Sequence, residues 1–256
     1  MRKGEGMRLT GQVALITGGT GALGRAVTTA FVEAGAAVAV TYVVDPEVPE
    51  CKVCLGPWAD APLFLKADVT VEAEVKKLVQ TVVERLGRVD ILLNLVGGYV
   101  GDLPVKELPE ATWDHMVNIN LKSAFLCCKH AVPVMQRGGG GRIVTVSSRA
   151  ALKVFPGISA YATAKAGLLA FTETLASEVL KDNITVNAIL PSVIDTPASC
   201  SSSAPRPPAR SPAPPSRSTA APDAPGARLA YGSPPRSASS CRRSAWACSS
   251  PAPSPA

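Results

Sequence analysis

Short apolar runs alternate with amphipathic stretches along the first 197 residues of the chain. Buried strands of a parallel sheet appear as continuous apolar runs, whereas a helix that covers a sheet repeats its apolar residues every three or four positions. These patterns predict strands at residues 13–17, 37–42, 63–66, 89–95, 142–147 and 184–190. Between them they predict helices at residues 22–34, 71–86, about 110–136 and 158–181.

Strand and helix follow one another throughout this region, which is typical of an α/β protein with a doubly wound parallel sheet. In such sheets ligands bind at the carboxyl ends of the strands, so residues that follow the strands are the candidates for function. Residues 43–60 interrupt the alternation. They contain Pro46, Pro49 and Pro57, and we expect them to be irregular.

The composition changes after Pro197. Residues 198–256 contain 13 of the 23 prolines, many Ala, Ser and Arg, and no Val, Ile, Phe or Lys. Because this segment cannot bury enough apolar surface to offset its ordering entropy, we expect a disordered tail. Its composition is what a shifted reading frame of GC-rich DNA would produce, and a natural low-complexity tail is the alternative. The expected divisions are a leader at 1–10, one α/β domain at 11–197 and the tail at 198–256.

The net charge of +6 comes from the tail. Removing its seven Arg and one Asp from the 26 basic and 20 acidic residues leaves 19 of each in the body. A neutral body gives no indication of a nucleic-acid partner. An arginine-rich arm that binds nucleic acid is a weak alternative, because the tail arginines are dispersed without interleaved aromatic residues.

Membrane and metal signals are also missing from the sequence. No run of about 18 apolar residues predicts a membrane span, and the start of the chain lacks the apolar stretch of a signal peptide. We therefore expect a cytoplasmic protein, with Met7 as an alternative start.

Cys51 and Cys54 form a C-x-x-C pair without the second ligand pair that zinc needs. They are interpreted as reduced thiols, with a redox or metal role as the alternative.

A glycine-rich turn, Thr17-Gly-Gly-Thr-Gly-Ala-Leu-Gly24, lies between the first predicted strand and helix. Glycines there let the backbone approach a pyrophosphate, and the helix N-terminus favours its negative charge. Since many turns are rich in glycine, a purely structural turn is the alternative. The strand–turn–helix context favours dinucleotide binding.

Candidate acid–base residues come from the last predicted helix. Tyr161 and Lys165 are four residues apart and so share one helix face. A nearby ammonium favours the phenolate form of a tyrosine, which can then exchange a proton with a substrate hydroxyl. Taken alone, such a pair is more often a Tyr packed on a Lys side chain. Ser148, at the end of the fifth predicted strand, offers a hydroxyl to a substrate oxygen.

These motifs occur in one order: the glycine turn, Asn94-Leu-Val-Gly97, Asn120, Ser148, Tyr161-x-x-x-Lys165, and residues 187–196. That set resembles the short-chain dehydrogenases/reductases, in particular members similar to 3-oxoacyl-carrier-protein reductases. The resemblance covers about residues 10–197. It implies a Rossmann fold and an NAD(P)-dependent oxidoreductase that transfers a hydride between nicotinamide and a carbonyl or alcohol substrate.

The resemblance also implies roles for individual residues. Tyr161 would be the general acid/base, Lys165 would lower its pKa and hold the nicotinamide ribose, and Ser148 would orient the substrate oxygen. Asn120 would hold a water molecule in the proton relay. The residues implied in cofactor binding, besides Tyr161 and Lys165, are Thr17, Gly18, Thr20, Ala22, Leu23, Gly24, Tyr42, Asp68, Val69, Asn94, Gly97, Pro191, Ile194 and Thr196.

Some positions depart from the family pattern. Ala22 replaces a glycine of the turn, and its methyl group would crowd the pyrophosphate or shift the turn unless the neighbouring Gly21 relieves this. NAD-preferring members carry an acid where this chain has Tyr42, and NADP-preferring members often carry Arg where it has Val43 or Gly21. Without an acid to repel a 2′-phosphate, the sequence favours NADP slightly over NAD.

The largest departure follows Thr196, where the family continues into a substrate-covering lid, a helix and a last strand. The proline-rich tail provides none of these. The alternative function is therefore a non-catalytic dinucleotide-binding protein that has lost turnover with this region. In the family the helix at 158–181 also packs against a partner subunit, which implies a homodimer or homotetramer. The substrate is not readable from the sequence.

Overall fold

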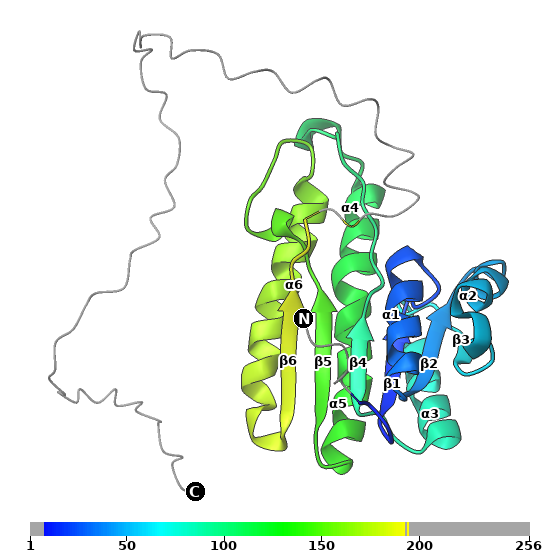
Figure 1. Ribbon diagram of the computed structural model, residues 1–256. Helices are drawn as coiled ribbons and strands as arrows, with labels where there is room; N and C mark the ends of the chain where they lie inside the picture. The colour runs from blue at the N-terminus through cyan, green and yellow to red at the C-terminus, as the bar shows by residue number, and fades with distance from the viewer. Residues whose placement is uncertain (1–7, 193, 195–256) are drawn as a thin grey trace, which may run out of the picture. The chain divides into compact units, whose positions relative to one another are not determined.

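The six apolar runs pair as parallel strands of a single sheet. The computed structural model describes residues 8–192 and 194 (Figure 1). The strands are β1 (Val13–Thr17), β2 (Ala37–Tyr42), β3 (Leu63–Lys66), β4 (Ile91–Asn94), β5 (Gly141–Val146) and β6 (Ile184–Ile189). Their order in the sheet is β3-β2-β1-β4-β5-β6, and every neighbouring pair is parallel. The predicted doubly wound α/β sheet is confirmed.

The helices cover the two faces of this sheet in two groups. They are α1 (Ala22–Glu33), α2 (Glu47–Leu55), α3 (Glu72–Leu86), α4 (Glu110–Val117), α5 (Ser123–Arg137) and α6 (Ser159–Glu178). Buried side chains of α3, α5 and α6, such as Val79, Met135 and Leu175, pack in one core cluster. Residues of α1 and α2, such as Val32 and Leu55, pack in a second cluster on the other face. None of the helices within the described part of the chain is long and apolar enough to cross a membrane.

The expectation that residues 43–60 are irregular is wrong. Helix α2 lies within this segment and is followed by a 3-10 turn at Gly56–Trp58. Pro46 is the residue before the helix and Pro49 is in its first turn. Backbone N–H groups of a first helical turn have no intrahelical acceptor, so a proline there removes no hydrogen bond. Prolines at these positions are therefore compatible with the helix.

The predicted helix at about 110–136 is interrupted by a wider turn. The chain is α-helical in α4, π-helical at Asn118–Lys122 and α-helical again in α5. Single π turns inserted in helices are often found at functional sites. Here the π turn contains Asn120, which was selected as a candidate from the sequence.

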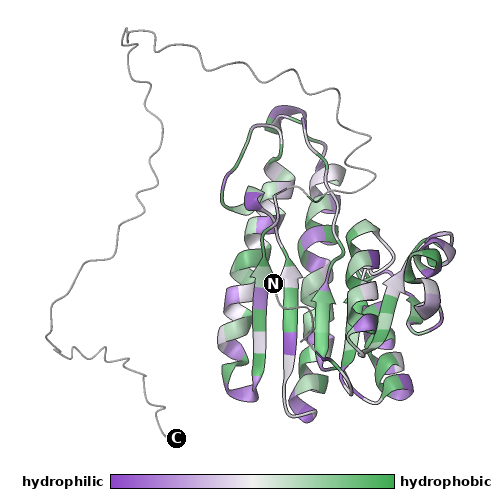
Figure 2. Ribbon diagram, viewed as in Figure 1, coloured by the Kyte–Doolittle hydropathy of each residue, from purple (hydrophilic) through white to green (hydrophobic). Residues whose placement is uncertain are grey.

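Central and edge strands differ in how fully they are buried. All five residues of β1 are buried, whereas buried and exposed residues alternate along most of β6. Figure 2 shows the same contrast between β4, which is hydrophobic over most of its length, and β6, in which apolar and polar bands alternate.

The sequence expectations for a leader at 1–10, except residues 8–10, and for the tail at 198–256 lie outside the described residues.

Candidate functional site

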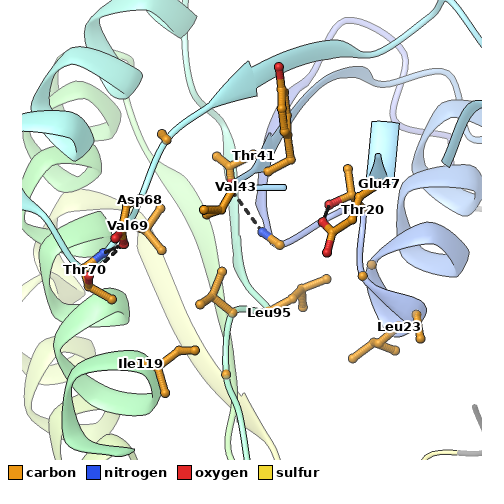
Figure 3. Close-up of a pocket in the computed structure, with 18 of the residues that line it drawn as sticks. Thr20, Leu23, Thr41, Val43, Glu47, Asp68, Val69, Thr70, Leu95 and Ile119 are labelled. Carbon is orange, nitrogen blue, oxygen red and sulfur yellow. Dashed lines mark hydrogen bonds between the residues drawn. The ribbon is translucent and has the colours of Figure 1, made fainter. Parts of the chain in front are cut away.

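A cavity of about 630 Å³ opens at the carboxyl ends of β1, β2, β3 and β4. It lies where parallel-sheet proteins of this type bind their ligands. Figure 3 shows residues from several of these ends facing the same space. The sequence-selected residues that line it are Gly18, Thr20, Ala22, Leu23, Gly24, Tyr42, Asp68, Val69 and Gly97.

The glycine turn forms one wall of this cavity. Gly18 has a φ of +65° and its N–H donates to the Thr41 hydroxyl over 3.0 Å. A Cβ on Gly24 would lie 2.2 Å from the Gly18 carbonyl oxygen, so only glycine lets α1 pack this closely on the turn. In the part of the chain that the structure describes, no side chain caps α1 at Gly21, and the first turn of α1 has no acidic residue. Its free N–H groups can therefore bind an anion such as a pyrophosphate.

The alanine that departs from the family pattern does not disrupt this turn. Ala22 is exposed, lines the cavity and is the first residue of α1. The turn before it is closed by a hydrogen bond from the Gly21 N–H to the Gly18 carbonyl, 3.1 Å long. The turn therefore keeps its hydrogen-bonded form with an alanine at this position.

Two of the selected residues lie beneath the cavity and do not line it. The Thr17 hydroxyl donates to the Leu93 carbonyl and accepts a hydrogen bond from the Leu95 N–H, which ties the ends of β1 and β4 together. The Asn94 amide donates to the Cys128 sulfur over 3.5 Å. Its Oδ1 is buried and has no hydrogen-bond partner among residues 8–192 and 194. Both side chains support the floor of the site.

Several lining residues were not selected from the sequence. They are Gly21, Thr41, Val43, Glu47, Ala67, Thr70, Leu95, Val96, His115, Asn118 and Ile119. Some of them, such as Thr41 and Leu95, are near strand ends, where strand position alone could have indicated them. Glu47 belongs to the segment that was expected to be irregular, and no sequence signal placed it at the site.

Lys165 is a buried cation beside the end of β5. Its ammonium donates to the Val146 carbonyl over 2.8 Å, and its own carbonyl accepts a hydrogen bond from the Ser147 hydroxyl. Burial lowers the pKa of Lys165 to about 8. The ammonium lies 5.9 Å from the ring centroid of Tyr161, one turn earlier on α6. The spacing read from the sequence therefore does bring these two side chains together.

Asn120 and Gly97 connect the lysine with the cavity. The Asn120 amide donates to the Gly98 and Met116 carbonyls, both over 3.0 Å, and its Oδ1 accepts from the Gly98 N–H. A Cβ on Gly97 would lie 2.8 Å from Asn120 Oδ1 and 3.2 Å from Lys165 Nζ. Lys165 and Asn120 therefore both lie against Gly97, which lines the cavity. A side chain at this position would collide with them.

Ser148 and Tyr161 do not line the cavity. Ser148 Oγ accepts a hydrogen bond from the Ala150 N–H over 3.1 Å, while the Tyr161 ring is half-buried and packs edge-on against Tyr99. The Pro191 carbonyl accepts a hydrogen bond from the Arg149 N–H, which places Pro191 near Ser148. Ile194 is half-buried, and Thr196 lies outside the described residues.

The C-x-x-C pair lies on helix α2. Cys51 is buried with its sulfur 3.9 Å from the Gly19 carbonyl oxygen, whereas Cys54 is exposed, and both are free thiols. Among residues 8–192 and 194, no group of three or more His, Cys, Asp or Glu is placed to hold a metal ion.

The sheet order, the uncapped glycine turn and the cavity together define a dinucleotide-binding α/β protein. Residues 12–206 match the family model of the short chain dehydrogenases. The chain belongs to this family, whose members are oxidoreductases.

Individual relatives agree with this assignment. The chain is 39% identical to a probable galactose dehydrogenase of Rhizobium meliloti, with 71% of each protein covered. It is 37% identical to a 3-oxoacyl-[acyl-carrier-protein] reductase of Thermotoga maritima, over 75% of this chain and 77% of that protein. The crystal structure of levodione reductase superposes with a TM-score of 0.71 at 34% identity, covering 74% of each chain.

Proposed function

We propose that this chain is an NAD(P)-dependent oxidoreductase that interconverts a carbonyl and an alcohol, with Tyr161 as its general acid/base. The observation that carries the proposal is the buried Lys165 ammonium, one helical turn from Tyr161 and beside the cavity at Gly97. A reaction that moves a hydride to a carbonyl carbon also needs a proton at the oxygen. These two side chains can supply it.

The proton chemistry follows from the positions of the charges. A cation near a phenol favours loss of the phenol proton, and a phenol that exchanges its proton readily is an effective acid/base. Lys165 is held in place by the Val146 carbonyl, so its charge has a fixed position. Ser148 is at the end of β5, and its hydroxyl would orient the substrate oxygen toward Tyr161.

The cavity residues would hold the cofactor, which when bound supplies or accepts the hydride. Gly18, Thr20, Ala22, Leu23 and Gly24 would bind the pyrophosphate, and Asp68 with Val69 would contact the adenine. Tyr42 would lie beside the adenosine ribose, and Thr17 and Asn94 would support the site from below. Lys165 and Gly97 would hold the nicotinamide ribose. Pro191, Ile194 and Thr196 would contact the carboxamide.

Replacing Tyr161 with Phe tests the proposed role. We expect Tyr161→Phe to lower kcat by at least about 100-fold, because general acid–base catalysis contributes on that order. Binding of NADH or NADPH, followed by nucleotide fluorescence, should be unchanged. Turnover would be measured on a panel of ketones, aldehydes and the corresponding alcohols.

Tyr99→Phe is the matched control, since it removes a hydroxyl from the neighbouring ring and keeps the edge-on contact. We expect it to retain activity. Full activity of Tyr161→Phe would contradict the assignment. Cofactor binding by the wild type without turnover of any compound would favour the non-catalytic alternative.

We also propose a homodimer or homotetramer in the cytoplasm. An exposed aromatic side chain supports the assembly: Phe125 on α5 is 42% exposed and packs edge-on against Phe171 on α6, with ring centroids 6.0 Å apart. Exposed aromatic side chains on neighbouring helices are typical of subunit interfaces. The cytoplasmic location rests on the sequence alone and stays a prediction.

A further inference from the structure

Glu47 is an acidic residue in the cavity that lies beyond the end of β2. It is the first residue of α2, is half-buried and lines the cavity together with Thr20, Tyr42 and Val43. Its Oε2 accepts a hydrogen bond of 2.5 Å from the hydroxyl of Thr20, a buried residue of the glycine turn. Figure 3 shows the two side chains meeting on the wall opposite Asp68 and Thr70.

The charge of Glu47 is not neutralised by a neighbouring cation. Among the described residues it makes no ion pair. Arg25 donates to the Thr20 carbonyl and is paired with Glu50. Lys66 at the end of β3 is paired with Asp45. The wall formed by Thr20 and Glu47 therefore presents a negative charge to a ligand.

We propose that Glu47 determines the choice of cofactor and makes the cavity select NAD over NADP. The inference rests on the proposed function, because it concerns the nucleotide that the same cavity binds. Glu47 Oε1 has no hydrogen-bond partner within the described part of the chain and can accept a hydrogen bond from a ribose hydroxyl. A phosphate on that ribose adds about −1.5 to −2 charges and would be repelled by the carboxylate.

Glu47 does not occupy the position at which NAD-preferring members of the family carry an acid. Tyr42 and Val43 occupy the positions at the end of β2, and neither is charged. On those two residues alone the site has no means of rejecting a 2′-phosphate. The fold supplies the acid five residues after Tyr42, because α2 turns back over the glycine turn and brings Glu47 onto Thr20.

The test compares NADH and NADPH binding to the full chain by fluorescence titration. We expect the wild type to bind NADH at least about tenfold more tightly than NADPH, since like-charge contacts cost several kcal/mol. Glu47→Gln keeps an oxygen that accepts from Thr20 but removes the charge, so the preference should fall to within about threefold. Raising the salt concentration should weaken the wild-type preference and leave that of Glu47→Gln unchanged.

Glu84→Gln, on the exposed face of α3 and outside the cavity, is the charge-matched control and should keep the wild-type preference. A wild type that prefers NADPH, or a Glu47→Gln variant with the wild-type ratio, would overturn the inference and leave the proposed function intact. A wild type that binds neither nucleotide would overturn both.

Discussion

The β1–β3 half of the sheet is covered on both faces, whereas the β6 edge is covered on one. Leu15 of β1 packs against the cluster of α3, α5 and α6, and its neighbour Ile16 packs against the cluster of α1 and α2. On β6, Val186 is buried against α6, but Ile189 is 50% exposed. No helix within residues 8–192 and 194 packs on that second face (Figure 1).

This difference separates the two parts of the site. The glycine turn and the cavity walls extend from the doubly covered half, where close packing fixes the backbone. Lys165, Tyr161 and Ser148 lie beside the end of β5, where Ser147, Ser148 and Lys165 are buried polar residues. The first part depends on steric fit, and the second depends on electrostatic interactions next to the edge strand β6.

A pair of identical substitutions tests this contrast in stability. Ile16→Ala removes a fully buried side chain and should lower the free energy of unfolding by about 2–5 kcal/mol. Ile189→Ala removes a half-exposed one and should cost less than about 1 kcal/mol. Urea unfolding followed by circular dichroism measures both. Equal losses would show that another part of the chain, or a second subunit, covers β6.

Two glycines of the turn test the steric part of the site. Gly24→Ala places a methyl group 2.2 Å from the Gly18 carbonyl oxygen, whereas the same group at Gly21 would lie 3.4 Å from it. We expect Gly24→Ala to destabilise the chain by about 3 kcal/mol and to weaken nucleotide binding strongly. Gly21→Ala should change stability by less than about 1 kcal/mol. Thermal unfolding with and without NADH distinguishes them, and similar melting temperatures would contradict the steric argument.

The pH dependence of stability tests the electrostatic part. The pKa of Lys165 is about 8 in the folded chain and has an ordinary value of 10.5, so the unfolded chain binds more protons between these values. Stability from this group therefore rises as the pH increases from 8 to 10.5 and is lowest below pH 8. Lys165→Met should remove this rise and stabilise the chain at pH 7 by on the order of 1–2 kcal/mol.

Comparing urea unfolding of both proteins at pH 7 and pH 10 measures this effect. The difference between them should shrink at the higher pH. A difference that does not change with pH would mean that Lys165 is stabilised by contacts beyond the Val146 carbonyl.

The sequence by itself determined most of the helices and strands and nine of the residues that line the cavity. Strand and helix periods are local, so the positions of β1 to β6 and of α1, α3 and α6 were predicted within a few residues, whereas α4 and α5 were predicted as one helix. The glycine turn and the Tyr161–Lys165 spacing were also readable, because both lie within a single turn or helix. Helix α2 was not predicted, because its prolines were interpreted as a sign of irregular structure. They occupy the start of the helix, where proline is tolerated.

Only the tertiary structure decided which distant residues meet. The pairing of β4 with β1, the burial of Lys165 against Val146 and the contact of Glu47 with Thr20 join residues that are far apart in the sequence. Such contacts depend on how helices pack across a sheet, and no local pattern encodes that packing. For this reason the local motifs of the candidate site were readable from the chain, whereas the charge around its cavity was not.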